Sequence, residues 1–239
     1  MKDLITLING GIEARTGDLT MQKKVWEAAA GYFRPDISLY RNTRPSVILA
    51  RETGDLGLAL LWIVQAALAR PVFNDLVLAA EDVSGLSDII PGMNEKTILS
   101  LAHSESPAEP VTYMINGRDA LLTGTKKFIT AGRNSGIIMI TCREAGAPKI
   151  DRIALTGIEE LPSGAMNPLA LKITRTVDHA SLTMNQFRLD AGRLPAVDPS
   201  AVRRSVKKWD IVERALILES FLAFLIYCNH LFSRLGVTI

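Results

Sequence analysis

The chain has 239 residues, 48% of them hydrophobic and 22% charged, which is typical of a globular protein that buries a sizeable core. The formal net charge is only +2, so no nucleic-acid partner is expected, because phosphate recognition needs clustered lysine and arginine side chains. Cys142 and Cys228 lie far apart in apolar segments, which predicts reduced, buried thiols and neither a disulfide framework nor a metal site. No signal-peptide core precedes Glu13, so a cytoplasmic location is expected.

Residues 1–97 are expected to form an N-terminal helical domain. The apolar stripe of the first predicted helix follows i, i+3, i+4 and i+7 spacing and consists of Val25, Ala28, Ala29 and Tyr32. The segment before Pro45 is expected to be irregular, and Ser46 is the predicted N-cap of a short second helix. Asp55 opens a third helix that is too apolar for a surface position, which indicates the centre of a bundle. Pro71 is compatible with the first turn of a further helix.

A middle β-domain is expected over residues 98–195, where the pattern changes to short segments rich in β-branched residues. The six predicted strands lie within residues 97–104, 111–117, 119–132, 135–144, 152–158 and 179–189. Six such segments in about 95 residues predict a small barrel or sandwich. Asn116-Gly117 predicts a tight hairpin in which both residues accept positive φ.

Helical periodicity returns near Ala201, so residues 196–239 are expected to form a C-terminal helical region. Strands and helices are therefore segregated along the chain, which predicts an α+β fold and argues against a doubly wound parallel sheet. Residues 215–232 are about as long and as apolar as a transmembrane helix. Glu219 and Asn229 interrupt them at a high cost in hydrocarbon, so we expect no membrane span and favour a helix buried on nearly all sides by protein.

One segment, residues 115–146, carries a specific motif. A strand and a glycine turn are followed there by a strand of the pattern G-x-K-x-[FW]-I-[ST], formed by Gly124, Lys126, Lys127, Phe128, Ile129 and Thr130. This arrangement resembles the middle-domain core of the acyl-CoA dehydrogenase family. Ser104-Glu105 resembles the family's Thr-Glu turn, and residues 209–224 resemble the start of its first long C-terminal helix. The resemblance covers most of the chain from about Arg51 onward.

The resemblance implies an FAD site on the middle domain. Phe128 and Thr130 should point the same way because strand residues alternate, and in the family this pair faces the isoalloxazine ring, with the hydroxyl reaching flavin N5. Leu101, His103 and Ser104 are implied as further flavin contacts. The alternative is that Phe128 points inward and Thr130 is an ordinary strand threonine. For His103, a local hydrogen-bonding role is favoured over that of a general base.

The resemblance also implies a catalytic carboxylate that removes the α-proton of an acyl thioester. In most relatives this glutamate lies in a loop between the later helices of the C-terminal bundle, before which this sequence stops. A minority place it directly before an arginine in the first long C-terminal helix. Glu213 and Arg214 match that position, as catalytic base and substrate-binding residue respectively. Burial should raise the pKa of Glu213. The alternative is a first-turn glutamate that only favours the helix dipole.

Two functions follow from these features. The first is an FAD-dependent oxidoreductase acting on the CH–CH group of acyl-CoA or a related thioester, as in fatty acid metabolism. The second is a non-catalytic scaffold or binding subunit, because no Gly-Ser-Asp segment follows Ser106 and the C-terminal bundle is incomplete. The apolar residues left without cover predict a homo-oligomer or a complementary subunit. These residues are Leu216, Leu218, Phe221, Leu222, Phe224, Leu225 and Leu231.

Overall fold

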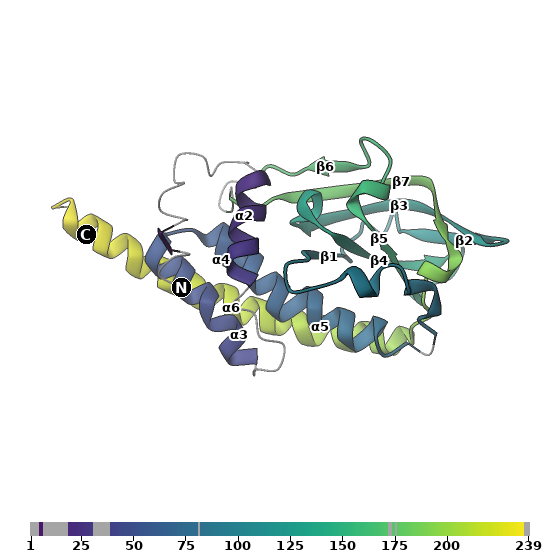
Figure 1. The fold of residues 1–239 in the computed structure, drawn as a ribbon, viewed down its shortest axis with the longest axis horizontal. Coiled ribbons are helices and arrows are strands. Elements are labelled where there is room, and N and C mark those ends of the chain that lie inside the picture. The colour runs from purple at the N-terminus through teal and green to yellow at the C-terminus, as the bar shows by residue number, and fades with distance from the viewer. Residues whose placement is uncertain are drawn as a thin grey trace.

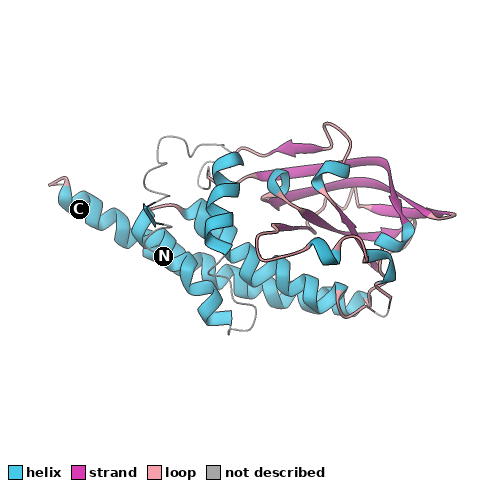
Figure 2. Cartoon of the chain, in the orientation of Figure 1, coloured by secondary structure: helices cyan, strands magenta, loops and turns pink. Residues whose placement is uncertain are grey.

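The computed structural model describes residues 5–6, 19–30, 39–80, 82–171, 174 and 176–236. Within these ranges the chain forms helices, then a seven-stranded sheet, then one long helix (Figure 1). Figure 2 shows the strands gathered in one part of the molecule and the long helices alongside them. The predicted α+β architecture is therefore confirmed. The division into domains at residues 97 and 195 stays a prediction.

The first two helices are α2 (Leu19–Ala30) and α3 (Leu39–Thr53). The buried face of α2 consists of Val25, Trp26, Ala29 and Ala30. Ala28 is exposed, so its predicted place in the stripe is wrong, and Tyr32 lies outside the described residues. The predicted start of the second helix is also wrong, since α3 begins before Pro45 and continues through it. Packing compensates for the backbone hydrogen bond that proline removes, because Leu49 and Ala50 are fully buried in the helical core.

The third and fourth predicted helices are one continuous helix. It runs through α4 (Leu56–Val64), a π-helical stretch (Gln65–Ala69), α5 (Arg70–Val72) and a second π-helical stretch (Phe73–Val77). The helix start predicted at Pro71 is wrong, because the wider π-turn before it accommodates a residue with no N–H to donate. Asp55 caps the helix by accepting a hydrogen bond from Leu58 N at 3.0 Å. Among the described residues only this helix is long and apolar enough to cross a membrane, and 72% of its most apolar window is buried against the chain.

The sheet contains all six predicted strands and one that the sequence did not reveal. The strands are β1 (Leu99–Ala102), β2 (Thr112–Asn116), β3 (Asp119–Thr130), β4 (Ile137–Glu144), β5 (Arg152–Thr156), β6 (Met166–Pro168) and β7 (His179–Asp190). Their order is β1-β4-β2-β3-β7-β6, with β5 paired to β4, and the sheet curls into a half-barrel. Strand β6 was missed because it has three residues, one of them proline.

The predicted hairpin joins β2 to β3, where Asn116 pairs with Asp119. Gly117 adopts φ +63°, whereas Asn116 does not take a positive φ and ends the strand. The prediction of two residues with positive φ is therefore wrong. A glycine at the first of two central positions is sufficient for this turn.

Alternate residues of β4 face two different cores. Ile137 and Met139 pack in a cluster with residues of the Leu56–Val77 helix, while Ile138 and Ile140 pack inside the curled sheet. Cys142 follows Ile140 into the inner core as a free thiol, and burial raises its pKa to about 12. The free, buried thiol predicted for Cys142 is thus confirmed. Cys228 is also a free thiol but is only half-buried on the C-terminal helix, so its predicted burial is wrong.

The chain continues into α6 (Pro199–Arg234), a helix of 36 residues. Asp198 caps it by accepting hydrogen bonds from Ser200 N and Ala201 N. The helix packs along α3 and α4, and its C-terminal part extends beyond the other helices (Figure 1). Within residues 215–232 only Ser220 and Ala223 are buried, so the prediction of a helix buried on nearly all sides is wrong for this chain.

Candidate functional site

Two hydrogen bonds bring the end of β1 beside the motif at the end of β3. Ser100 donates its hydroxyl to the carbonyl oxygen of Thr130 at 2.7 Å. Lys127 N donates to the carbonyl oxygen of Ser104 at 2.8 Å. The segment expected to contact a flavin from β1, which includes Leu101 and Ser104, therefore lies next to the segment expected to contact it from β3.

A β-bulge separates Phe128 from the regular ladder. Lys126 pairs with Leu182 and Ile129 pairs with Ala180, so two residues of β3 stand opposite one residue of β7. Phe128 adopts φ +58°, an uncommon backbone conformation for a bulky side chain, and is 61% exposed. The alternative of an inward-facing phenylalanine is therefore wrong.

Thr130 lies two residues beyond Phe128, on the other side of fully buried Ile129. Its hydroxyl oxygen is 3.4 Å from Nδ1 of His179, the residue opposite it in the register with β7. Nε2 of the same ring is 2.9 Å from the hydroxyl of Thr174. The sequence did not single out His179 or Thr174, because only the β3–β7 register brings them to the motif.

An ion-pair cluster supports the bulge from inside the barrel. Lys126, whose side chain is fully buried, pairs with Glu105 and donates to the hydroxyl of Thr141 at 3.1 Å and to the carbonyl of His103 at 3.2 Å. Arg143 pairs with the second carboxylate oxygen of Glu105. Burial acts to raise the pKa of Glu105, but the hydrogen bond and the charge of Lys126 outweigh it. The pKa of Glu105 is therefore below its usual value, and this carboxylate is ionised at neutral pH.

His103 is neutral near pH 7. Burial and the charge of Lys126 lower its pKa to about 4, although Glu105 and Asp210 act in the opposite direction. Its Nδ1 lies 3.1 Å from the hydroxyl of Thr141, as expected for a local hydrogen-bonding histidine.

Glu213 lies on α6 one turn after Asp210, on the same side of the helix. Burial raises its pKa to about 7, Asp210 adds to the rise, and Arg214 opposes it. The predicted direction of this shift is confirmed. Because α6 begins at Pro199, Glu213 is well inside the helix, and the first-turn alternative is wrong. Arg214 is exposed, and its Nε donates to Asp210 at 3.0 Å.

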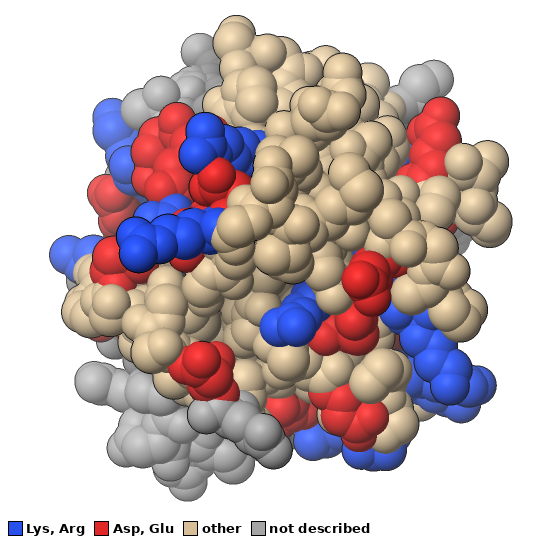
Figure 3. All heavy atoms as spheres, turned by 90° about the vertical axis from the view of Figure 1, so that its right-hand side faces the viewer, with Lys and Arg blue, Asp and Glu red and all other residues tan. Residues whose placement is uncertain are grey.

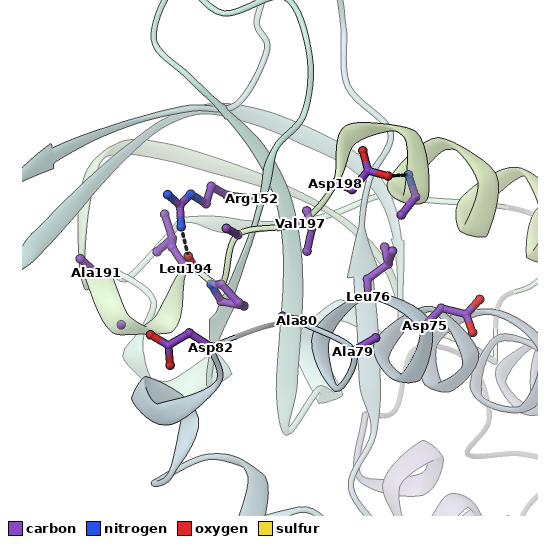
Figure 4. Close-up of a pocket in the computed structure, with 14 residues that line it drawn as sticks. Asp75, Leu76, Ala79, Ala80, Asp82, Arg152, Ala191, Leu194, Val197 and Asp198 are labelled. Carbon is purple, nitrogen blue, oxygen red and sulfur yellow. Dashed lines mark hydrogen bonds between the residues drawn. The ribbon is translucent and has the colours of Figure 1, made fainter.

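A separate pocket of about 620 Å³ lies where the Leu56–Val77 helix meets the start of α6 (Figure 4). None of the predicted site residues lines it. Its polar groups already serve the fold, since Arg152 donates to the carbonyl of Leu194 at 3.1 Å and Asp198 caps α6. Asp75 accepts hydrogen bonds from Ser205 and Trp209.

The described residues contain no group of three or more His, Cys, Asp or Glu side chains that could hold a metal ion. Figure 3 shows one end of the molecule, where acidic and basic side chains are interspersed over a largely uncharged surface. Two features of the predicted site residues stand out separately: an exposed aromatic residue and a hydroxyl at the end of β3, and a carboxyl group of raised pKa on α6.

No protein-family model and no curated protein matches the sequence. The fold is similar to that of the prolyl acyl carrier protein oxidase AnaB, with a TM-score of 0.70 and 14% identity over 98% of this chain and 67% of AnaB. It is also similar to the FAD complex of PigA, with a TM-score of 0.68 and 13% identity over 92% of this chain and 60% of PigA. Glutaryl-CoA dehydrogenase from Mycobacterium smegmatis gives a TM-score of 0.63 and 15% identity over 93% of this chain and 61% of the dehydrogenase. The chain thus has the acyl-CoA dehydrogenase-like fold and spans 60–67% of the length of these three structures.

Proposed function

We propose that this chain is an FAD-binding, acyl-CoA dehydrogenase-like protein that takes part in the oxidation of an acyl thioester. The observation that carries the proposal is that Phe128, exposed and held at positive φ by a bulge, lies two residues before Thr130 in this fold. A bulky aromatic side chain held in a strained and exposed conformation is unfavourable unless it serves a function.

The residues present fit a flavin ring. An isoalloxazine ring needs a flat apolar contact beside a small number of polar groups that fix its orientation. Phe128 supplies the first, and the hydroxyls of Thr130 and exposed Ser104 supply the second. Leu101 and His103 complete the proposed contacts. When bound, FAD supplies the hydride acceptor of the reaction.

Glu213 is the proposed base. A carboxyl group with a pKa of about 7 is half ionised at neutral pH, the condition in which a general base works well. AnaB and the glutaryl-CoA enzyme are described by name as acting on a carrier-protein substrate and a CoA substrate, and both classes are thioesters. An acyl-CoA or a related thioester is therefore the proposed substrate class, with Arg214 on the solvent side of the base as a proposed substrate contact.

Titration with FAD, followed by the absorbance and fluorescence of the flavin, tests this proposal. Saturable binding is expected, and Thr130→Ala should weaken it several-fold, because one hydrogen bond contributes about 1 kcal/mol. Thr125→Ala is the matched control on the same strand and should bind FAD as the unaltered protein does. Absence of binding at high micromolar FAD would reject the flavoprotein and leave the non-catalytic scaffold.

We further propose that the chain self-associates through α6. The exposed apolar residues of this helix are Ile211, Ile217, Leu218, Phe221, Leu222, Leu225, Ile226, Leu231 and Phe232. A contiguous apolar surface of this kind usually marks an interface.

A further inference from the structure

Helix α6 carries a row of exposed apolar residues in which each member follows the last by seven positions. The row consists of Ile211, Leu218, Leu225 and Phe232. Seven residues are close to two turns of an α-helix, so these side chains lie along one face. The helix packs on α3 and α4 with its opposite side, which carries the buried residues Val202, Ser205, Ser220 and Ala223. The row therefore points away from the rest of the chain.

This row matches itself when a second copy of α6 runs in the opposite direction. With a two-fold axis between residues 221 and 222, Ile211 of one copy lies opposite Phe232 of the second copy, and Leu218 lies opposite Leu225. The symmetry repeats both contacts, because a two-fold interface pairs each residue with its partner twice. All members of the row thus meet apolar residues.

The polar residues on this side of α6 match in the same arrangement. Arg214 and Asn229 are both exposed and lie equally far from residues 221–222, one on each side. The two-fold axis therefore places Arg214 of one copy opposite Asn229 of the other. Neither polar side chain is then buried against an apolar one, which would cost the hydrogen bonds it makes with water.

The basic residues of α6 disfavour a parallel pair. Arg203, Lys207 and Arg214 are exposed on the same side of the helix as the apolar row. In a parallel pair each of them would lie beside its own counterpart, and adjacent like charges weaken an interface. In the antiparallel pair the two copies of Lys207 lie at opposite ends, roughly 45 Å apart at the rise of an α-helix.

We propose that two copies of this chain pair through α6 in antiparallel orientation, with the two-fold axis between residues 221 and 222. The antiparallel pair rests on the proposed self-association, for which it specifies the orientation and the register. A two-fold interface needs a surface that is complementary to itself. The matching of apolar with apolar and polar with polar residues gives α6 such a surface.

Cysteine cross-linking of the assembled protein tests the orientation and the register. Cys228→Ser serves as the background, because it removes the half-buried thiol of α6 and leaves only buried Cys142. Leu218→Cys and Leu225→Cys are then expressed separately and together. Both positions are exposed within one chain, so the fold should be retained. Under mild oxidation the co-expressed variants should form several-fold more disulfide-linked dimer than either variant alone.

The expected difference follows from the length of a disulfide. In the antiparallel pair residue 218 lies opposite residue 225, whereas the two copies of residue 218 are offset by seven residues, about 10 Å along the helix. A disulfide requires Cα atoms within about 7 Å of each other. Ile115→Cys, co-expressed with Leu225→Cys, is the control and should form no disulfide-linked dimer.

Ile211→Cys with Phe232→Cys provides a second pair of variants if the first does not assemble. Equal cross-linking by each variant alone would show a parallel pair and overturn the proposal. An assembly in sedimentation that gives no cross-link in either co-expressed pair would overturn it as well, while the self-association stands. A monomeric unaltered chain would instead reject the self-association and the antiparallel pair together, and would show that something other than a second copy covers α6.

Discussion

At the scale of single residues, the first lysine of the β3 motif has a structural role. Lys126 is buried and bonded to Glu105, Thr141 and the carbonyl of His103, whereas adjacent Lys127 is exposed. The pair of charges at Glu105 and Lys126 holds the end of β1 against the bulge that presents Phe128. The lysine of the motif thus supports the proposed site from the interior of the sheet and does not face it.

Lys126→Met should therefore destabilise the fold strongly. Removing one partner of a buried ion pair leaves the other charge without compensation, which costs about 3–5 kcal/mol. Arg143 still pairs with Glu105, so a loss near the lower end of that range is expected in urea unfolding. Lys127→Met is the matched control and should change stability by no more than about 0.5 kcal/mol. Equal stabilities of the two variants would contradict the supporting role of Lys126.

Glu213 gives a second prediction at this scale, through its pKa of about 7. The base form exists above that pH, so the rate of thioester oxidation should rise as pH increases through about 7. Glu213→Gln should lower the rate at least about a hundredfold without loss of FAD binding. Glu219→Gln, an exposed position on the same helix, should leave the rate unchanged.

The carboxyl group of Glu213 should also make the stability of the fold depend on pH. Its effect on stability is opposite to its effect on the rate, because stability should fall as pH rises. Because its pKa in the fold is higher than the ordinary value of 4.5, the folded chain binds more protons than the unfolded chain between about pH 4.5 and 7. Its contribution to the free energy of unfolding therefore falls as pH rises through this window. Thermal unfolding at pH 5 and pH 8 should show Glu213→Gln, relative to the unaltered chain, more stable at pH 8 than at pH 5. The reverse order would argue against a raised pKa of Glu213.

At the scale of elements, the bulges of β3 depend on close backbone contacts. Gly124 adopts φ +132° at a register shift against β7, and a Cβ added there would lie 2.3 Å from the carbonyl oxygen of Pro110. A side chain at this position would be strained by the positive φ and would collide with the backbone of Pro110. Gly124→Ala should therefore lower the free energy of unfolding by more than about 2 kcal/mol. Gly92→Ala, which meets nothing within 4 Å, should be close to neutral. A neutral Gly124→Ala would show that β3 can shift its register.

The strands were predictable because short segments rich in β-branched residues and the turn residues between them are local signals, as in β4 and the hairpin at Gly117. The helix boundaries at Pro45 and Pro71 were not, because packing in the helical core and π-turns keep both prolines inside helices. Within the site, Phe128 and Thr130 could be proposed from the motif and its resemblance. The contact with His179 could not, since it depends on the pairing of strands that are distant in sequence.

At the scale of the whole molecule, the sheet and α6 present two kinds of surface. The curled sheet is filled by its own side chains, whereas the C-terminal part of α6 packs on the rest of the chain along one side only (Figure 1). Leu218 and Leu222 are 60% and 55% exposed and lie four residues apart on one face of the helix. Helix α6 carries more large exposed apolar side chains than any other helix in the described part of the chain.

Sedimentation velocity should therefore show a dimer or a larger assembly of this chain. Leu218→Glu with Leu222→Glu should convert it to a monomer, because burying two carboxylates in an apolar interface costs more than the contacts return. Since both positions are exposed within one chain, helicity and the unfolding transition should change little. Ile115→Glu, which is 53% exposed at the end of β2, is the control and should leave the assembly intact. A monodisperse monomer of the unaltered chain would contradict an interface on α6 between copies of the protein.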